Sequence, residues 1–291
     1  MNRFPTKSIV VILMSSSTLP ESAGNSPKSQ ATVEQLSSLI QLVSAQMDPV
    51  KAIPESERVA WLASALKGRK NLIQYLSTKI IMDADRSKNE HRLSLLLLSM
   101  ILRMTSRISD SACRGSILSD LQSIEGFWPH ILSLVCSENL SVSIRSNALS
   151  LCINAYRLNN TMTAQPYWPS RLFSESTMQG VLDLIDKQRG SGSMGARVLL
   201  VCLEYLLLAR AVDQGRLVSC LATCNHSTIV SILELCGQIS IAGDRRVALL
   251  GFDPVIQDIR PDDVRTFVNH LIELGGERIY TPLALACIDS C

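Results

Sequence analysis

The chain of 291 residues has few aromatic side chains and little net charge. Phe, Trp and Tyr make up 4% of the residues, which leaves few side chains for stacking on nucleic-acid bases. The 28 Lys and Arg residues nearly balance the 26 Asp and Glu residues, so the total charge gives no strong field toward nucleic acid or membranes. The hydrophobic share of 46% is ample for a core and excludes a mainly disordered chain.

Long apolar runs are also missing. The run from Ile9 to Met14 has six residues, which is far too short to span a bilayer. The stretch from Val198 to Ala209 is interrupted by Glu204, which favours a buried helix. We therefore expect no membrane insertion.

The N-terminal segment differs from the rest of the chain. It carries Arg3 and Lys7 but no acidic residue before Glu21, a pattern similar to a mitochondrial presequence. Residues 15–30 are rich in Ser, Pro and Gly, with little to bury. We expect residues 1–30 to form a flexible or targeting-like leader, and residues 31–291 to form one α-helical repeat domain.

The nine cysteines are an odd number, which argues against a complete disulfide framework. Several lie inside apolar helical patterns, where a free thiol behaves as a small buried hydrophobe; they are Cys136, Cys152, Cys202 and Cys236. This usage is typical of a reducing compartment. We expect a cytoplasmic protein, with a mitochondrial location as the alternative.

No segment shows the sustained period-two alternation of a half-buried strand. Apolar residues instead recur at helical spacing from Ala31 onward. The predicted helices cover residues 33–47, 54–66, 70–82, 88–107, 110–123, 128–137, 141–157, 175–187, 195–211, 213–223, 227–238, 244–251, 261–274 and 281–289. The chain is therefore predicted to be all-α.

Two features recur along these helices. An Arg followed by a dense apolar stripe begins four of them, at Arg92, Arg145, Arg197 and Arg246, with spacings of 53, 52 and 49 residues. An aromatic-Trp-Pro sequence also occurs twice, ending at Pro129 and at Pro169. Repeated helix pairs cannot bury their apolar faces alone, so such units stack on one another.

One unit resembles a known repeat family. Its parts are Trp128 to Val135, a turn of Ser137 to Asn139, and Ile144 to Leu149. This unit resembles an armadillo/HEAT-type repeat, in which a helix ends in a Leu-Val stripe, an acidic turn follows, and the next helix opens with an apolar-Arg pair. The resemblance implies a right-handed α-solenoid of stacked helix pairs with a binding or scaffolding role. An irregular helical domain is the alternative fold.

Three patterns suggest chemistry but lack its context. Gly190 to Gly195 reads G-x-G-x-x-G, yet no strand leads into the first glycine, as a dinucleotide site requires. Cys220, Cys224, His226 and Cys236 have the right residue types for zinc but no C-x2-C spacing, so buried thiols are favoured. The four histidines are scattered, without the neighbours of a nucleophilic site. We expect no catalytic residue, cofactor or metal.

The sequence thus favours a noncatalytic helical-repeat protein that binds other proteins as an adaptor, scaffold or structural subunit of a larger assembly. The residues predicted to contact a partner are Arg103, Arg107, Arg145, Tyr167, Trp168, Arg197 and Arg246. The alternative is an RNA-binding helical-repeat protein, including one in an organelle, in which Arg103, Arg107 and the turn of Lys67 to Lys70 line one surface.

Overall fold

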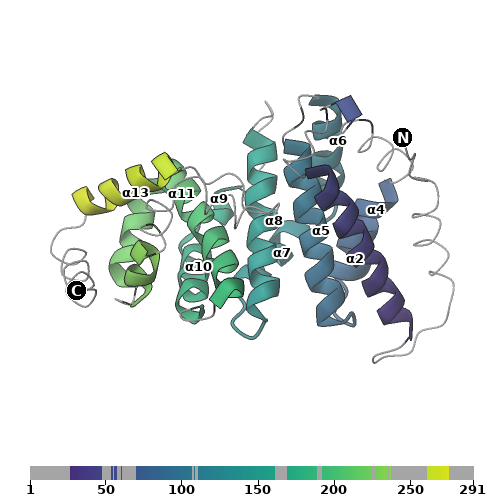
Figure 1. The fold of residues 1–291 in the computed structure, drawn as a ribbon, viewed down its shortest axis with the longest axis horizontal. Coiled ribbons are helices and arrows are strands. Elements are labelled where there is room, and N and C mark those ends of the chain that lie inside the picture. The colour runs from purple at the N-terminus through teal and green to yellow at the C-terminus, as the bar shows by residue number, and fades with distance from the viewer. Residues whose placement is uncertain are drawn as a thin grey trace. The chain divides into compact units, whose positions relative to one another are not determined.

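The fold is entirely helical over the part of the chain that the structure describes (Figure 1). The computed structural model describes residues 27–47, 54, 56–57, 60, 70–106, 108, 111–160, 169–188, 192–224, 227–234, 236 and 261–274. The prediction of an all-α protein is confirmed for these residues. Among their helices, none is long and apolar enough to cross a membrane.

The chain divides into two compact units. The first comprises Met1–His130 with Asn154–Gln165, and the second comprises Ile131–Ile153 with Pro166–Cys291. Helices α7 (Phe127–Cys136) and α8 (Val142–Asn160) contribute residues to both units. The single repeat domain over residues 31–291 and its solenoid arrangement stay predictions.

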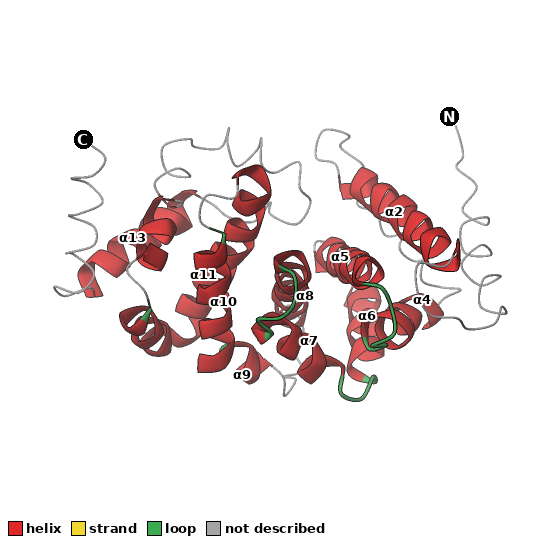
Figure 2. Ribbon diagram, turned by 90° about the horizontal axis from the view of Figure 1, so that it is seen from below, coloured by secondary structure: helices red, strands yellow, loops and turns green. Residues whose placement is uncertain are grey.

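The first unit is built around α5. Helix α5 covers Lys88–Ser106. The other elements are α2 (Pro27–Met47), α4 (Lys70–Tyr75), the π-helix η3 (Leu76–Ile81) and α6 (Ser111–Gln122). Helix α2 packs against α5 (Figures 1 and 2), and η3 packs against α5 as well. Helix α2 begins at Pro27, so the first four helical residues belong to the segment predicted to be a leader.

The second unit is arranged around α11. Its elements after α8 are α9 (Pro169–Leu172), α10 (Glu175–Lys187), α11 (Gly192–Thr223) and α13 (Pro261–Leu274). Helices α10 and α13 both pack against α11. Residues 227–234 are helical too.

Three helices are enclosed over most of their length. All described side chains of residues 93–105 in α5, 144–155 in α8 and 200–206 in α11 are buried. These are the helices whose beginnings the sequence marks with Arg92, Arg145 and Arg197. Enclosure on every face means that each of them packs against several neighbours. The fourth marked helix, at Arg246, lies outside the described residues.

Helix α11 is two helices joined by a break at Asp213, whose φ of −149° and ψ of 76° are not helical. The Asp213 carboxylate accepts the backbone N–H of Arg216 at 3.1 Å, which caps the second half. The sequence predicts separate helices over 195–211 and 213–223, and this division is confirmed.

The aromatic-Trp-Pro sequence at α7 is part of the core of the first unit. Phe127 and Trp128 are buried at the start of α7, and their ring centroids lie 5.1 Å apart at 72°. The second such sequence precedes α9, and its Tyr167 and Trp168 lie outside the described residues.

Candidate functional site: polar junctions at the helix ends

The structure describes the side chains of three residues predicted to contact a partner. Arg103 is 0% exposed and Arg145 is 1% exposed, so both guanidinium groups are enclosed by the fold and are absent from the predicted contact surface. Arg197 is half-buried on α11.

The remaining predicted residues, Arg107, Tyr167, Trp168 and Arg246, lie outside the described residues, as do the side chains of Lys67, Arg69 and Lys70. The surface predicted for RNA therefore loses Arg103, and its other members are not described.

Arg145 is the centre of a junction in the second unit. Its Nε donates to the Val135 carbonyl at 2.9 Å, and one terminal nitrogen donates to the Gly180 carbonyl at 2.9 Å. The other terminal nitrogen binds the Asp183 carboxylate at 2.7 Å. The first-turn side chain of α8 thereby joins the last turn of α7 to the middle of α10. The Val135 carbonyl lies in the last turn of α7, where carbonyls lack a partner within the helix.

The Asp183 carboxylate balances the charge of Arg145. It also lies 3.1 Å from the Lys187 ammonium one turn along α10, and its side chain is 29% exposed. Partial burial pulls the pKa of Asp183 upward, but the hydrogen bonds from Arg145 and Lys187 outweigh burial and hold that pKa below its ordinary value. Asp183 thus remains ionised at neutral pH, as the buried guanidinium requires.

Close approach of two backbones completes this junction. A Cβ atom on Gly180 would lie 3.2 Å from the Cα of Cys136 and 3.5 Å from its Sγ. Glycine therefore allows α10 to contact the end of α7 directly. The Cys136 thiol lies 3.6 Å from the Ser176 carbonyl in the first turn of α10.

A further set of contacts fixes the turn before α10. The Tyr205 hydroxyl donates to the Leu172 carbonyl at 2.8 Å, and the Phe173 and Tyr205 rings stack with centroids 5.7 Å apart. The Arg216 guanidinium donates to the Phe173 carbonyl at 2.9 Å. Both halves of α11 thus contact one turn, because Tyr205 and Arg216 lie on either side of the break.

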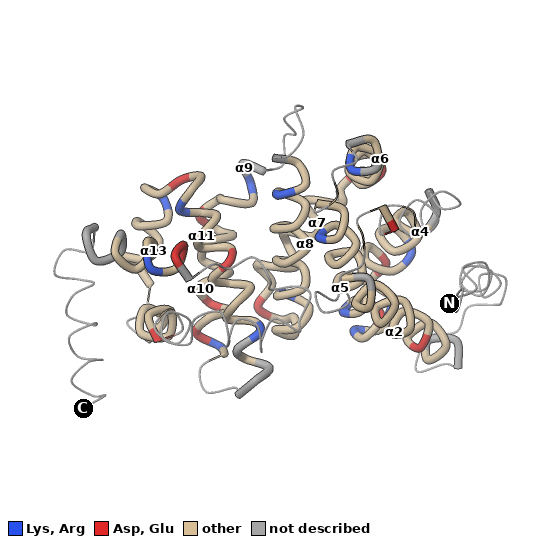
Figure 3. Tube along the Cα trace, turned by 45° about the horizontal axis from the view of Figure 1, so that its top comes forward, with Lys and Arg blue, Asp and Glu red and all other residues tan. Residues whose placement is uncertain are grey.

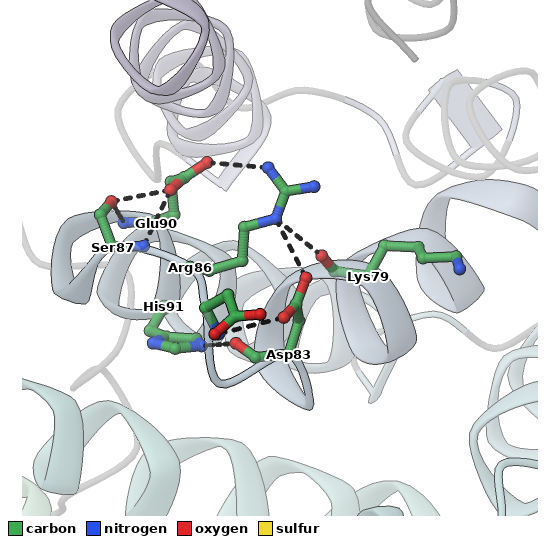
Figure 4. A network of polar contacts seen from close by, with 7 residues as sticks. Lys79, Asp83, Arg86, Ser87, Glu90 and His91 are labelled. Atoms are coloured by element: carbon green, nitrogen blue, oxygen red, sulfur yellow. Dashed lines mark hydrogen bonds and ion pairs between the residues drawn. The ribbon is translucent and has the colours of Figure 1, made fainter. Parts of the chain in front are cut away.

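The corresponding junction of the first unit lies at the end of η3 (Figure 4). Arg86 Nε donates to the Lys79 carbonyl at 3.1 Å, and His91 Nε2 lies 2.9 Å from the Asp83 carbonyl. His130 Nε2 reaches from α7 to the Ile81 carbonyl at 3.0 Å. A carbonyl oxygen only accepts, so each of these imidazoles carries a proton on Nε2. The side chains supply partners for carbonyls that the helix end leaves open.

Helix α5 begins with a reciprocal cap in the same junction. The Glu90 carboxylate accepts the backbone N–H of Ser87 at 3.0 Å and its hydroxyl at 2.8 Å, while the Ser87 hydroxyl accepts the N–H of Glu90 at 3.2 Å. This arrangement is a capping box. Glu90 is only 2% exposed and lies 3.5 Å from the Arg86 guanidinium.

The described cysteines are free thiols, and of the four that the sequence predicts to be buried, Cys136 is only half-buried. Cys152, Cys202, Cys220 and Cys236 are buried and unpaired with another cysteine, and Cys136 and Cys224 are half-buried. Burial raises the pKa of Cys202 and Cys236 to about 12, and that of Cys224 to about 11. In the part of the chain that the structure describes, no group of three or more His, Cys, Asp and Glu is placed to hold a metal ion. His226 lies outside that part.

The two junctions share one kind of chemistry. Charged and polar side chains bind backbone carbonyls of a neighbouring element. These side chains therefore hold helices at fixed separations and are not available to bind a ligand. The repeated position of Arg145 is visible in the sequence, but no local pattern indicates that Gly180 and Asp183 are its partners, or that His91 and His130 bind carbonyls in the other junction. Only the Ser-x-x-Glu spacing of Ser87 and Glu90 is a recognisable local signal.

No known protein family, curated protein or solved structure matches the chain.

The capping box at Ser87 should contribute measurably to stability. Ser87→Ala leaves the Glu90 N–H without its acceptor, and we expect a loss of about 1 kcal/mol in the free energy of unfolding. Urea unfolding of the full chain measures this loss. Ser38→Ala in α2 is the matched control, because the exposed Ser38 hydroxyl donates to the Glu34 carbonyl of its own helix. An equal effect of the two substitutions would contradict the capping role.

Replacing Arg145 tests the first junction. Arg145→Ala should lower the free energy of unfolding by about 3 kcal/mol, since it removes the side-chain donor to the Val135 and Gly180 carbonyls and takes a cationic partner from Asp183. Arg145→Lys keeps the charge but cannot reach all three acceptors, so we expect a smaller loss of about 1–2 kcal/mol. Arg265→Ala serves as the control, because the Arg265 side chain is 63% exposed. Urea unfolding that shows Arg145→Ala no worse than Arg265→Ala would refute the assignment.

Asp183 makes this contribution dependent on pH. Its pKa is lower in the folded chain than the unfolded value of about 4, so its stabilisation is present above pH 4 and is lost as the pH falls through the folded pKa. Asp183→Asn should cost about 2 kcal/mol at pH 7, and the difference from the wild type should shrink below pH 4. Thermal unfolding between pH 3 and 7 measures it. Asp262→Asn, at a side chain 89% exposed, should show no comparable change.

Proposed function

We propose that the chain is a noncatalytic helical-repeat protein that binds other proteins as an adaptor, scaffold or structural subunit of a larger assembly. The observation that carries the proposal is the set of three enclosed helices, α5, α8 and the first half of α11. Each begins near an Arg followed by an apolar stripe, at Arg92, Arg145 and Arg197. Recurrence of one buried helix at a spacing near 50 residues is typical of stacked helical repeats.

The order of elements along the chain supports the same interpretation. A long helix follows a shorter element three times: α5 of 19 residues follows η3, α8 of 19 residues follows α7 of 10, and α11 follows α10 of 13. A short helix then follows each long one, namely α6, α9 and the second half of α11. This short–long–short order is that of a three-helix repeat. A right-handed armadillo/HEAT-like solenoid, as the resemblance at about residues 128–158 implies, is part of this proposal.

The junctions fit a scaffold. Arg145, Asp183 and Glu90 are engaged in holding helix ends, so partner contacts would come from helix faces whose spacing these junctions keep constant. A rigid array of faces lowers the entropy that a partner loses on binding. The free thiols agree with a reducing compartment, for which we propose the cytoplasm, with a mitochondrial location as the alternative.

Proteins are favoured over RNA as partners. Burial of Arg103 removes one basic residue from the surface predicted for phosphate contacts. Figure 3 shows acidic and basic positions interspersed along the described helices of both units. A mixed surface of this kind is weakly suited to a polyanion.

Recovery of partners from the native source tests the proposal. A tagged full-length chain should retain one or more proteins in stoichiometric amounts after nuclease treatment and at elevated salt, and the purified proteins should reassemble. Arg197→Glu should weaken the complex about fivefold, which corresponds to roughly 1 kcal/mol at one contact residue. Arg265→Glu is the control, at an exposed position on α13.

Recovery of the chain alone would overturn the proposal. Loss of all partners on nuclease treatment, together with a steep salt dependence, would favour the RNA-binding alternative instead.

A further inference from the structure

We draw no further inference here: the strongest candidate, the hydroxyl cluster of Ser174, Ser176 and Thr177 in the turn and first residues of α10, rests on a helix N-terminus whose hydroxyls already bind one another and the neighbouring backbone, and nothing among the described residues points to a ligand at that place.

Discussion

The buried Arg145 guanidinium sets the main constraint on the second unit. A guanidinium group cannot lose its charge at any pH that a folded protein encounters, so burying it creates a demand for fixed acceptors. Two carbonyls and one carboxylate, from α7 and α10, meet that demand. The positions of three helix segments are thereby determined together, and Gly180 allows two of them to approach closely.

In the first unit, imidazole and guanidinium groups bind backbone carbonyls around η3. A π-helix places its hydrogen bonds one residue further apart than an α-helix, as the 3.0 Å bond from Met82 N–H to the Ser77 carbonyl shows. Arg86, His91 and His130 bind carbonyls at and beyond its end. Each unit thus fixes the end of a short element before a long enclosed helix begins. This shared design supports the proposal that the chain is a scaffold.

The helical periodicity of the sequence locates most helices well. The apolar residues that a helix buries are spaced within one segment, so the pattern can be seen without knowing the tertiary structure. The predicted ranges 175–187 and 261–274 coincide with α10 and α13, and the break near Asp213 is visible as a short change of pattern. The π-helix was not predictable, since its carbonyls are satisfied by residues of other elements. Arg145 was marked correctly as special, but the prediction of a surface role was wrong. The sequence shows where an arginine lies along a helix, and its acceptors are 10, 35 and 38 residues away.

That separation has a consequence for how the protein is made. When Arg145 leaves the ribosome, Asp183, the residue that neutralises it, still follows 38 residues later along the chain. At about 5–20 residues per second, the 38 residues to Asp183 take roughly 2–8 s. During this interval the guanidinium needs water, so the start of α8 must stay open although its apolar stripe is complete. Completion of α10 is therefore the event that closes this part of the nascent chain.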